Sequence, residues 1–390
     1  MSFSFGFSGD DIEDDGQDEE QAGGLINDML KHFISEHTAG PSQTIAPRMH
    51  TLRELLQHAP SQLSYNTLKV TPRRDTTQSA YVPSTNVSLR STAVRRRSLF
   101  DIRAQLMAEV SPEEHEHNVS ENLLSGLESG DLTSGVYEGG FKTWECALDL
   151  ASLCSGLNFR PSGLSGWDIV EMGAGSAIPS LAILRNYLSN GATADLRMTL
   201  CDYNEDVLRL VTAPNVLVNC SQQAGTVPSS STSPADELSE EGEFDVEALG
   251  PHFIDDLETS LRQHRISLNF LSGGWGDSFN DLFASLSSEA NSTPPEPRHL
   301  LILASETIYS LASTKIFAAT LLQLIRKHRQ NFGASDAKAW VAAKKVYFGV
   351  GGGVDDFTHE IESHGGKAQV LYETSDTGVG RVILEVMLSV

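Results

Sequence analysis

A short glycine-containing turn is the strongest chemical signal in this sequence. The segment DIVEMGAGSAIPS (168–180) predicts a strand that ends at Glu171, after which Gly173 and Gly175 open a tight turn into a helix. Because these two positions carry no side chain, a bulky ligand can lie against the backbone there, and the helix N-terminus beyond them favours a carboxylate. A dinucleotide-binding motif would have a third glycine where this chain has Ile178, and the Gly-Lys-Ser/Thr string of a phosphate-binding loop is absent.

A carboxylate follows at the tip of the next predicted strand. The string LRMTLCDYN ends this strand at Asp202. A carboxylate in this position can accept hydrogen bonds from both ribose hydroxyls of an adenosine-containing ligand. An acid that caps the helix starting near Glu205 would explain Asp202 alone, but it would not explain why the acid comes one strand after the glycine turn. The two motifs together predict a cofactor site.

Two further groups of residues follow the third and fourth predicted strands. The string FLSGGWGDSF places residues 273–275 where an adenine ring would lie, so that Trp275 either stacks on the ring or plugs the end of the sheet. The string ASETIYS places Ser305, Glu306 and Tyr309 at the carboxyl end of the fourth strand. Open α/β sheets bind their ligands at this edge, so an acid there is expected to face the substrate.

These groups require a framework of strands that end at one edge of a sheet. From about residue 135, short apolar strands alternate with helical stretches, and the early strands are nearly continuous apolar runs. This pattern predicts an α/β fold of the Rossmann-like type, with a seven-stranded, mostly parallel sheet, helices on both faces and an antiparallel last strand. The predicted strands are 168–171, 196–201, 266–271, 300–305, 344–350, 369–373 and 381–388, and the main predicted helices are 178–187, 205–219 and 315–329.

Taken together, the motifs resemble those of one known family. The strings KTWECALDLA (142–151), EMGAGSAIPS, CDYNEDVL, SGGWGD, SETIYS and KVYFGVGGGVDDF are similar to those of the histidine protein methyltransferase 1 family. This family is related to the protein-lysine methyltransferases that carry an acid-x-x-Tyr motif. The likeness covers most of 135–390 and also the opening FSFGFSGDDIEDD. It implies a seven-strand fold, S-adenosylmethionine as methyl donor, and methylation of the tele nitrogen of a histidine in a large-subunit ribosomal protein.

The resemblance also implies which residues bind the donor. It places the TWECA segment along the methionine end, the DYN segment around the ribose, the GGW segment at the adenine, and the serine after the fourth strand where it closes the site. The implied cofactor-binding residues are Thr143, Trp144, Glu145, Cys146, Ala147, Glu171, Gly173, Gly175, Asp202, Tyr203, Asn204, Gly273, Gly274, Trp275 and Ser305. The chain departs from the family pattern at Ala174, where many relatives have cysteine or another small residue, and in a longer acidic insertion.

Methyl transfer from a sulfonium depends mainly on holding the nucleophile, the methyl carbon and the sulfur in line. A histidine side chain, with an unperturbed pKa of about 6.5, is mostly neutral at cellular pH, whereas a lysine, at about 10.4, must first lose a proton. A histidine-specific site must therefore fix the tautomer. We expect Glu306 or Tyr309 to serve as the catalytic group that orients or accepts the proton on the other ring nitrogen.

Three other interpretations remain open from the sequence. A lysine methyltransferase would share the fold and the acid-x-x-Tyr motif. A non-catalytic module could escort a ribosomal protein, although it would have no need for the motif residues that suit a cofactor. The missing third glycine makes a nicotinamide-dependent dehydrogenase the weakest of the alternatives.

Composition limits the partners. The net charge of −24 argues against general nucleic-acid binding and fits a basic protein substrate. No apolar run is long enough for a membrane span, and the acidic N-terminus lacks the features of a signal peptide. The four cysteines have no metal-type spacing, and His115 and His117 lack a third ligand, so no metal site is predicted. We expect a monomer in the cytoplasm and nucleus, with reduced thiols.

The remaining segments predict a two-part organisation. Residues 1–134 form an acidic and then basic N-terminal region, partly disordered with short helices such as 24–37. The basic stretch 69–103 is read as a solvated arm, with nuclear import or docking as the alternative. Residues 135–390 form the methyltransferase domain, which an acidic, disordered insertion interrupts at about 221–260. An acidic lure for a basic substrate is the alternative reading of this insertion.

Overall fold

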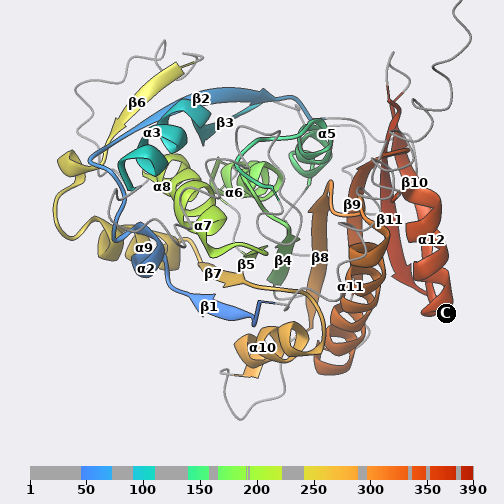
Figure 1. The fold of residues 1–390 in the computed structure, drawn as a ribbon. Helices are drawn as coiled ribbons and strands as arrows, with labels where there is room; N and C mark the ends of the chain where they lie inside the picture. Colours follow the sequence, from blue (N-terminus) through green and yellow to red (C-terminus); the bar gives the residue numbers. More distant parts are fainter. Residues whose placement is uncertain are drawn as a thin grey trace, which may run out of the picture. The chain divides into compact units, whose positions relative to one another are not determined.

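The computed structural model of this chain describes eleven stretches of sequence. From Ile45 onward, the described part of the chain forms one compact unit built around a large sheet (Figure 1). The described residues are 45–72, 91–109, 139–157, 166–189, 191, 194–221, 241–288, 297–332, 336–347, 352–374 and 379–389.

The central sheet has eight strands in the order β1-β7-β5-β4-β8-β9-β11-β10. The strands β7, β5, β4, β8 and β9 pair in parallel, whereas β11 is antiparallel to both of its neighbours and β1 is antiparallel to β7. The strands are β1 (Arg48–His50), β4 (Gly166–Met172), β5 (Asp195–Asp202), β7 (Ile266–Ser272), β8 (Arg298–Ser305), β9 (Ala337–Lys344), β10 (Gly366–Glu373) and β11 (Arg381–Leu388). This arrangement confirms the predicted α/β fold with a mostly parallel sheet and an antiparallel last strand, and β1 extends the seven predicted strands by one.

One of the seven predicted strands is wrong. The fifth strand was expected at 344–350, but β9 occupies Ala337–Lys344 and ends where the prediction begins. Its sequence, AKAWVAAK, is rich in alanine, which has low β-propensity. Alanine fits because β9 lies deep in the sheet, where Ala339, Trp340 and Val341 are fully buried. The string KVYFGV led to the wrong prediction, because its β-branched and aromatic residues are typical of strands although they follow β9.

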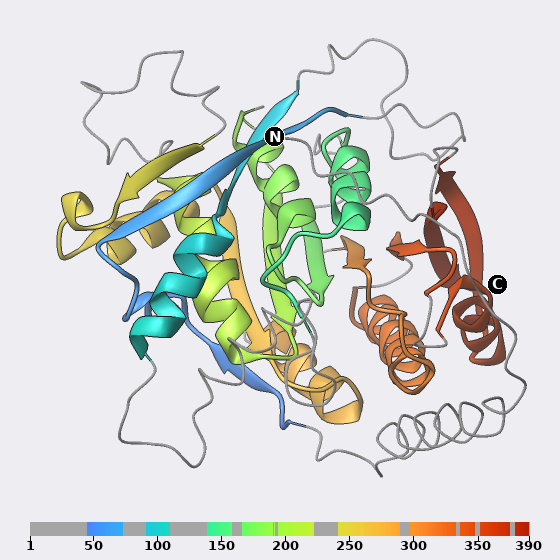
Figure 2. The ribbon, with the colours of Figure 1, turned by 45° about the horizontal axis from the view of Figure 1, so that its top comes forward.

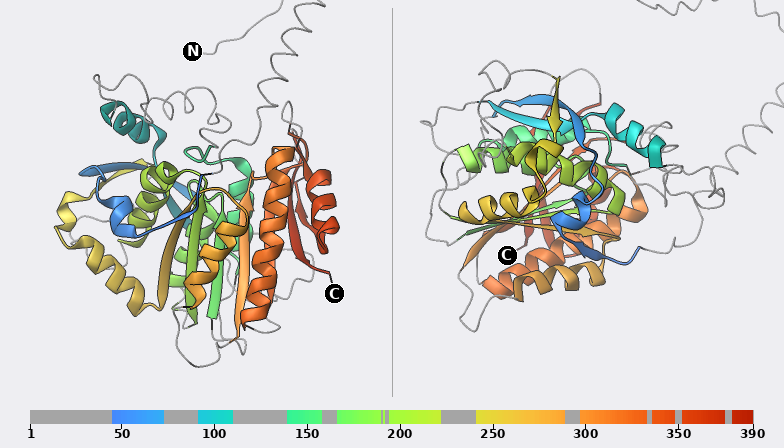
Figure 3. Two further views of the ribbon diagram at one scale, coloured as in Figure 1. Left: turned by 60° about the horizontal axis from the view of Figure 1, so that its bottom comes forward. Right: turned by 90° about the vertical axis from the view of Figure 1, so that its left-hand side faces the viewer.

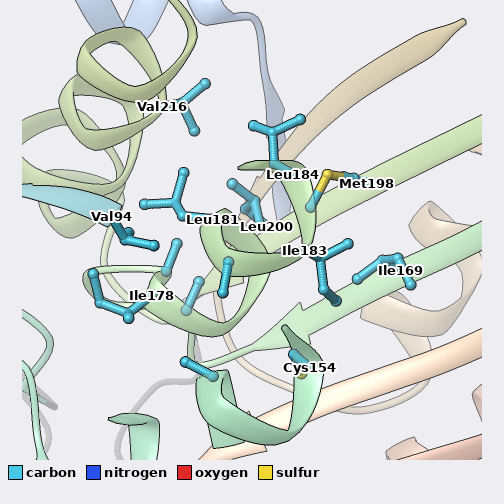
Figure 4. Packing of buried hydrophobic residues seen from close by; sticks show 14 of the residues in the cluster. Val94, Cys154, Ile169, Ile178, Leu181, Ile183, Leu184, Met198, Leu200 and Val216 are labelled. Atoms are coloured by element: carbon cyan, nitrogen blue, oxygen red, sulfur yellow. The ribbon is translucent and has the colours of Figure 1, made fainter. Parts of the chain in front are cut away.

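Helices cover both faces of the sheet, as the right-hand view in Figure 3 shows. Alternate residues along a strand point to opposite faces: in β4, Ile169 packs into one core cluster and Val170 into the other. On the first face, Ile183 lies beside Ile169 and Leu184 lies beside Met198 (Figure 4), in the same core cluster. The first face carries α5 (Glu145–Cys154), α6 (Ile178–Ser189), α8 (Ala213–Cys220) and α9 (Phe253–Gln263), and the second carries α10 (Asp277–Ser288), α11 (Leu311–Phe332) and α12 (Val354–Ser363).

A second, three-stranded antiparallel sheet packs on this helical layer, with the order β3-β2-β6 (Figure 2). It consists of β2 (Gln62–Val70), β3 (Thr92–Arg97) and β6 (Glu241–Asp245). Two asparagines of α8 accept hydrogen bonds from backbone N–H groups of the edge strand β3. Asn219 Oδ1 accepts from Arg95 N at 2.9 Å, and Asn215 Oδ1 accepts from Arg97 N at 2.6 Å. The small sheet is therefore joined to the main core through α8.

This sheet overturns two predictions. The basic stretch 69–103 is not a solvated arm in its described part, because Arg95 and Arg97 are buried and Arg97 Nε donates to Asp101 at 2.6 Å. The whole of 221–260 is not an unstructured insertion either, because β6 pairs with β2 and α9 packs into the core. The acidic composition of EGEFD concealed an edge strand in which only Phe244 is buried.

The division expected near residue 135 does not separate two folded parts. The strand β1 belongs to the central sheet, and β2 pairs with β6 from the second half of the chain. The short helices α2 (Leu52–Leu56) and α3 (Leu99–Glu109) lie in the same compact unit. The predicted helix 24–37, the HEH string at 115–117 and residues 222–240 lie outside the described residues. No described helix is long and apolar enough to cross a membrane.

Candidate active site

The predicted glycine turn lies at the carboxyl end of β4, in the middle of the sheet. Gly173 has φ 68° and Gly175 has φ 49°, values in the left-handed region that glycine adopts without strain. A Cβ on Gly175 would lie 3.1 Å from Gly140 Cα, so the two backbones are in direct contact. A Cβ on Gly173 would meet only Thr307 Cγ2, at 2.9 Å. The turn therefore presents bare backbone at the edge where α/β sheets bind ligands.

Three side chains from other elements hold this turn in place. Thr143 Oγ1 donates to Ser176 Oγ at 2.7 Å, which ties the TWEC segment to the turn. Thr212 Oγ1 donates to Gly175 O at 2.7 Å, and Asn215 Nδ2 donates to Ser176 O at 2.9 Å. Thr212 ends a π-helical turn, Leu208–Thr212, between α7 (Glu205–Val207) and α8. Such turns often occur at functional sites, and sequence reasoning missed both Thr212 and Asn215.

The predicted ribose acid is in contact with the same turn. Asp202 is buried at the end of β5, where its Oδ2 accepts from Gly175 N at 2.9 Å and its Oδ1 accepts from Asn204 N at 3.2 Å. The backbone amide of Gly273, after β7, donates to the Asp202 carbonyl at 3.0 Å. The ends of three neighbouring strands are thus connected through Asp202.

Glu171 lies beneath the turn rather than in it. The side chain is buried, and its Oε2 accepts from Ser180 N in the first turn of α6 at 3.0 Å. Its Oε1 has no hydrogen-bond partner among the described residues. Because burial disfavours the charged form, the pKa of Glu171 is raised to about 8.

The predicted adenine end is walled by a segment that sequence reasoning missed. Gly274 N donates to Ile45 O at 2.9 Å, and a Cβ on Gly273 would lie 2.6 Å from Pro47 Cα. Residues 45–47, directly before β1, therefore lie on the glycine pair. The Trp275 ring packs against Phe317 with a centroid distance of 4.9 Å, which favours the reading in which it closes the end of the sheet.

An acid cluster lies next to the glycine turn, at the ends of β8 and β9. Glu306 directly follows β8 and has φ 57°, a conformation that is unfavourable for a residue with a side chain and is often found at functional sites. Its Oε2 accepts a hydrogen bond of 2.5 Å from the Tyr347 hydroxyl, and Lys344 Nζ lies 3.8 Å from its Oε1. Glu306 Oε1 has no hydrogen-bond partner in the described part of the chain.

The start of α5 completes this cluster. Lys344 Nζ lies 3.3 Å from Glu145 Oε2 and 4.9 Å from the centroid of the Trp144 ring. Burial and the charge of Glu306 both raise the pKa of the Cys146 thiol, so this cysteine is protonated. The same two causes raise the pKa of the Tyr347 phenol. The structure thus brings together Trp144, Glu145, Cys146 and Glu306, which the sequence identified separately.

The structure shows a hydrogen bond to Glu306 from Tyr347, which the sequence did not single out, while the orienting role expected of Tyr309, three residues after Glu306, stays a prediction. Tyr309 lies one turn further along the chain, half-buried, and its carbonyl accepts from Gly352 N at 3.0 Å. The signal for Tyr347 was present in the string KVYFGVGGG, but the misplaced fifth strand put this residue inside a strand. Of the other predicted residues, Ala147 lies in the first turn of α5, Tyr203 follows Asp202, and Ser305 ends β8.

Comparison with known proteins places the chain in a family. No protein-family profile matches the sequence. Histidine protein methyltransferase 1 of Saccharomyces cerevisiae is 31% identical over 375 residues, which cover 92% of this chain and 89% of the yeast protein. The chain belongs to the histidine protein methyltransferase 1 family. The protein of the same name from Schizosaccharomyces pombe is 32% identical over 295 residues, which cover 74% of this chain and 75% of that protein.

Membership of this family, together with the fold, makes the protein an S-adenosylmethionine-dependent methyltransferase, which confirms the predicted enzyme class and methyl donor. Among solved structures, that of the mitomycin 7-O-methyltransferase MmcR is similar with a TM-score of 0.28 and 12% identity, covering 74% of this chain and 60% of the other. This similarity is too low to bear on the site.

Proposed function

We propose that this enzyme transfers a methyl group to the tele nitrogen of a histidine in a basic protein, specifically a large-subunit ribosomal protein. The observation that carries the proposal is the Glu306 carboxylate: Tyr347 donates to its Oε2, the Cys146 thiol and the Lys344 ammonium lie beside it, and its Oε1 is buried without a geometric hydrogen bond from another described residue. This carboxylate lies at the carboxyl edge of the sheet, and a Cβ on Gly173 would lie 2.9 Å from Cγ2 of the neighbouring Thr307. The names of the relatives support histidine as the acceptor.

The residues present fit S-adenosylmethionine. The bare glycine turn would accommodate the methionine part together with the segment that starts at Thr143, which is already hydrogen-bonded to the turn. Asp202 would accept from the ribose hydroxyls, flanked by Tyr203 and Asn204, and the residues after β7 would line the adenine. When bound, S-adenosylmethionine supplies an electrophilic methyl carbon attached to a sulfonium.

The acceptor needs a neutral imidazole with its proton on the nitrogen that does not attack. With an ordinary pKa of about 6.5, a histidine in the substrate is mostly neutral at cellular pH. The attacking nitrogen would supply the lone pair for the new bond to the methyl carbon, and the electron pair of the broken carbon–sulfur bond would stay on the sulfur. The ring becomes a cation and then loses the proton on its other nitrogen.

Glu306 would act on that second nitrogen. As an acceptor, Oε1 takes a hydrogen bond from the ring N–H, which fixes the tautomer and stabilises the charge that develops during transfer. The carboxylate then receives the proton and passes it to water. Tyr347 donates to Oε2 throughout, so it holds the carboxylate in one orientation.

The partner and the location are also proposals. With a net charge of −24, the protein attracts a strongly basic substrate over long range. Ribosomal proteins have this character, and they are found in both the cytoplasm and the nucleus. The same charge disfavours direct binding to nucleic acid.

The test uses purified protein, methyl-labelled S-adenosylmethionine and a ribosomal extract from cells that lack this gene, followed by acid hydrolysis. We expect the label in tele-methylhistidine, and we expect Asp202→Ala to abolish it. Label in methyllysine would contradict the proposed acceptor. The absence of both label and donor binding would favour the escort reading.

A further inference from the structure

A resident cation occupies the centre of the acid cluster. The ammonium of Lys344, the last residue of β9, lies 3.3 Å from Glu145 Oε2 and 3.8 Å from Glu306 Oε1. It also lies 4.9 Å from the centroid of the Trp144 ring. Its side chain is 23% exposed, so the ammonium is partly shielded from water. Two carboxylates and an aromatic ring therefore surround the Lys344 ammonium, and Lys142 Nζ lies 4.9 Å from the centroid of the same Trp144 ring.

These surroundings are the kind that bind a substrate ammonium. Carboxylates attract a cation by Coulomb interaction, and the face of a tryptophan attracts it through the ring quadrupole. A second ammonium that entered this cluster would face the charge of Lys344 at short range. A lysine substrate would therefore have to displace Lys344 from both Glu145 and Glu306 before its own nitrogen could use them.

A neutral imidazole makes no such demand. It needs one acceptor for its N–H, and Glu306 Oε1 provides it while Lys344 stays in place. Tyr347 fixes this arrangement, because its hydroxyl donates to Glu306 Oε2 at 2.5 Å and accepts from the backbone N–H of Lys344 at 3.2 Å. The cluster thus offers a hydrogen-bond acceptor to a neutral imidazole, whereas the position that a substrate ammonium would take is already occupied by Lys344.

We propose that Lys344 is a specificity-determining residue that excludes lysine side chains from the site by occupying the position of their ammonium group. This inference rests on the proposed function and deepens it, because it explains why an acid next to an aromatic ring, on a fold shared with lysine methyltransferases, acts on histidine. Specificity here comes from a repulsive element directed against the competitor as well as from an attractive one.

The experiment uses the full chain and its Lys344→Met variant. Each is incubated with methyl-labelled S-adenosylmethionine and the ribosomal extract, and the hydrolysate is separated into methylhistidine and methyllysine. We expect wild type to label histidine, and we expect the ratio of methyllysine to methylhistidine to rise at least about tenfold in Lys344→Met, because the repulsive charge is removed. Lys344→Arg, which keeps the charge, should retain the wild-type ratio.

A matched control is the adjacent Lys345→Met. Lys345, which directly follows β9, pairs with Glu373 at the end of β10 and is not part of the cluster, so this change should leave the ratio unaltered. Lys344→Gln decides the question if Lys344→Met does not fold. Donor binding, measured by calorimetry, should be retained in every variant.

Two outcomes would overturn the proposal. An unchanged ratio in Lys344→Met and Lys344→Gln would show that Lys344 does not select the substrate. Loss of histidine methylation without any gain of methyllysine, with donor binding intact, would make Lys344 a positioning residue for histidine instead. If the wild-type protein itself labels lysine, the proposed function fails, and this result differs from the two outcomes that overturn the role of Lys344.

Discussion

The hydroxyl of Tyr347 donates a hydrogen bond of 2.5 Å to Glu306 Oε2, and this contact joins the end of β9 to the end of β8. The contact holds Glu306 in one orientation, and Oε1, which has no hydrogen-bond partner among the described residues, is the oxygen that we propose accepts from the imidazole N–H.

The first prediction concerns this hydrogen bond. In Tyr347→Phe, the Glu306 carboxylate loses its orienting donor, and we expect kcat for histidine methylation to fall about 100-fold. The dissociation constant for S-adenosylmethionine, measured by calorimetry, should change less than about twofold, because Tyr347 does not line the glycine turn.

Two further variants test the roles of the neighbouring groups. Tyr309→Phe is the matched control, since it removes a hydroxyl from the tyrosine that the sequence motif suggested; a larger loss of kcat there would assign the orienting role to Tyr309. Glu306→Gln should lower kcat more than donor affinity. Equal losses of both would leave Glu306 as a structural acid.

The second prediction concerns the backbone of Glu306. Its φ of 57° is unfavourable for any residue with a Cβ, so a glycine at this position should relieve strain that an alanine would keep. We expect Glu306→Gly to have a free energy of unfolding about 1 kcal/mol higher than Glu306→Ala, by urea denaturation. Both variants lack the carboxylate and should be equally inactive. If Glu306→Ala were more stable than Glu306→Gly, the backbone at this position would not be strained.

The third prediction separates stability from chemistry. At the amino end of β4, the buried carboxylate of Asp168 accepts from Arg197 Nε and Nη2, both at 2.6 Å, and from Arg298 Nε at 2.8 Å. Replacing one partner of such a buried network leaves the others uncompensated, so Asp168→Asn should cost about 3–5 kcal/mol of unfolding free energy. Asp255→Asn, which breaks an exposed pair with Arg53, should cost less than about 1 kcal/mol. Donor affinity well below the denaturation midpoint should be unchanged in both.

Much of the fold could be predicted because local sequence and burial agree. The strands β4, β5 and β8 are almost completely buried, and their apolar runs indicate this directly. The strand β9 is equally buried but consists largely of alanine, which carries no strand signal of its own. The three-residue β1 and the acidic β6 form strands only because distant segments pair with them.

The site divides in the same way. Glycines directly after a predicted strand and acids at strand ends are visible in the sequence, so Gly173, Gly175, Asp202 and Glu306 could be found. Residues that hold these groups were missed because nothing in their own segments marks them. Thr212, for example, is a polar residue in a helical pattern, and only the fold brings it to the Gly175 carbonyl.

The fourth prediction concerns the segment that lies on the glycine pair. Gly273 and Gly276 have similar φ values of 112° and 135°, but an added Cβ would meet Pro47 at 2.6 Å only at Gly273, whereas nothing lies within 4 Å at Gly276. Gly273→Ala should displace residues 45–47 and weaken donor binding at least about tenfold, by calorimetry. Gly276→Ala has the same backbone strain without the clash, so it should bind the donor several times more tightly than Gly273→Ala. Equal affinities would show that residues 45–47 do not shape the donor site.

The last prediction concerns the pH dependence of stability. Burial raises the pKa of Glu171 to about 8 in the folded protein, against about 4.3 in an unfolded chain. The folded state therefore holds this proton more tightly, so the stability it contributes is fully present below about pH 4.3 and is lost as the pH rises through 8, at about 1.4 kcal/mol for each pKa unit. We expect the free energy of unfolding without donor to fall between pH 6 and pH 9 in wild type, and to fall by clearly less in Glu171→Gln, whose amide does not titrate. Urea denaturation at both pH values measures this difference. Parallel curves for the two proteins would mean that Glu171 is already ionised at pH 6 in the folded state, where the Ser180 N–H donates to its Oε2.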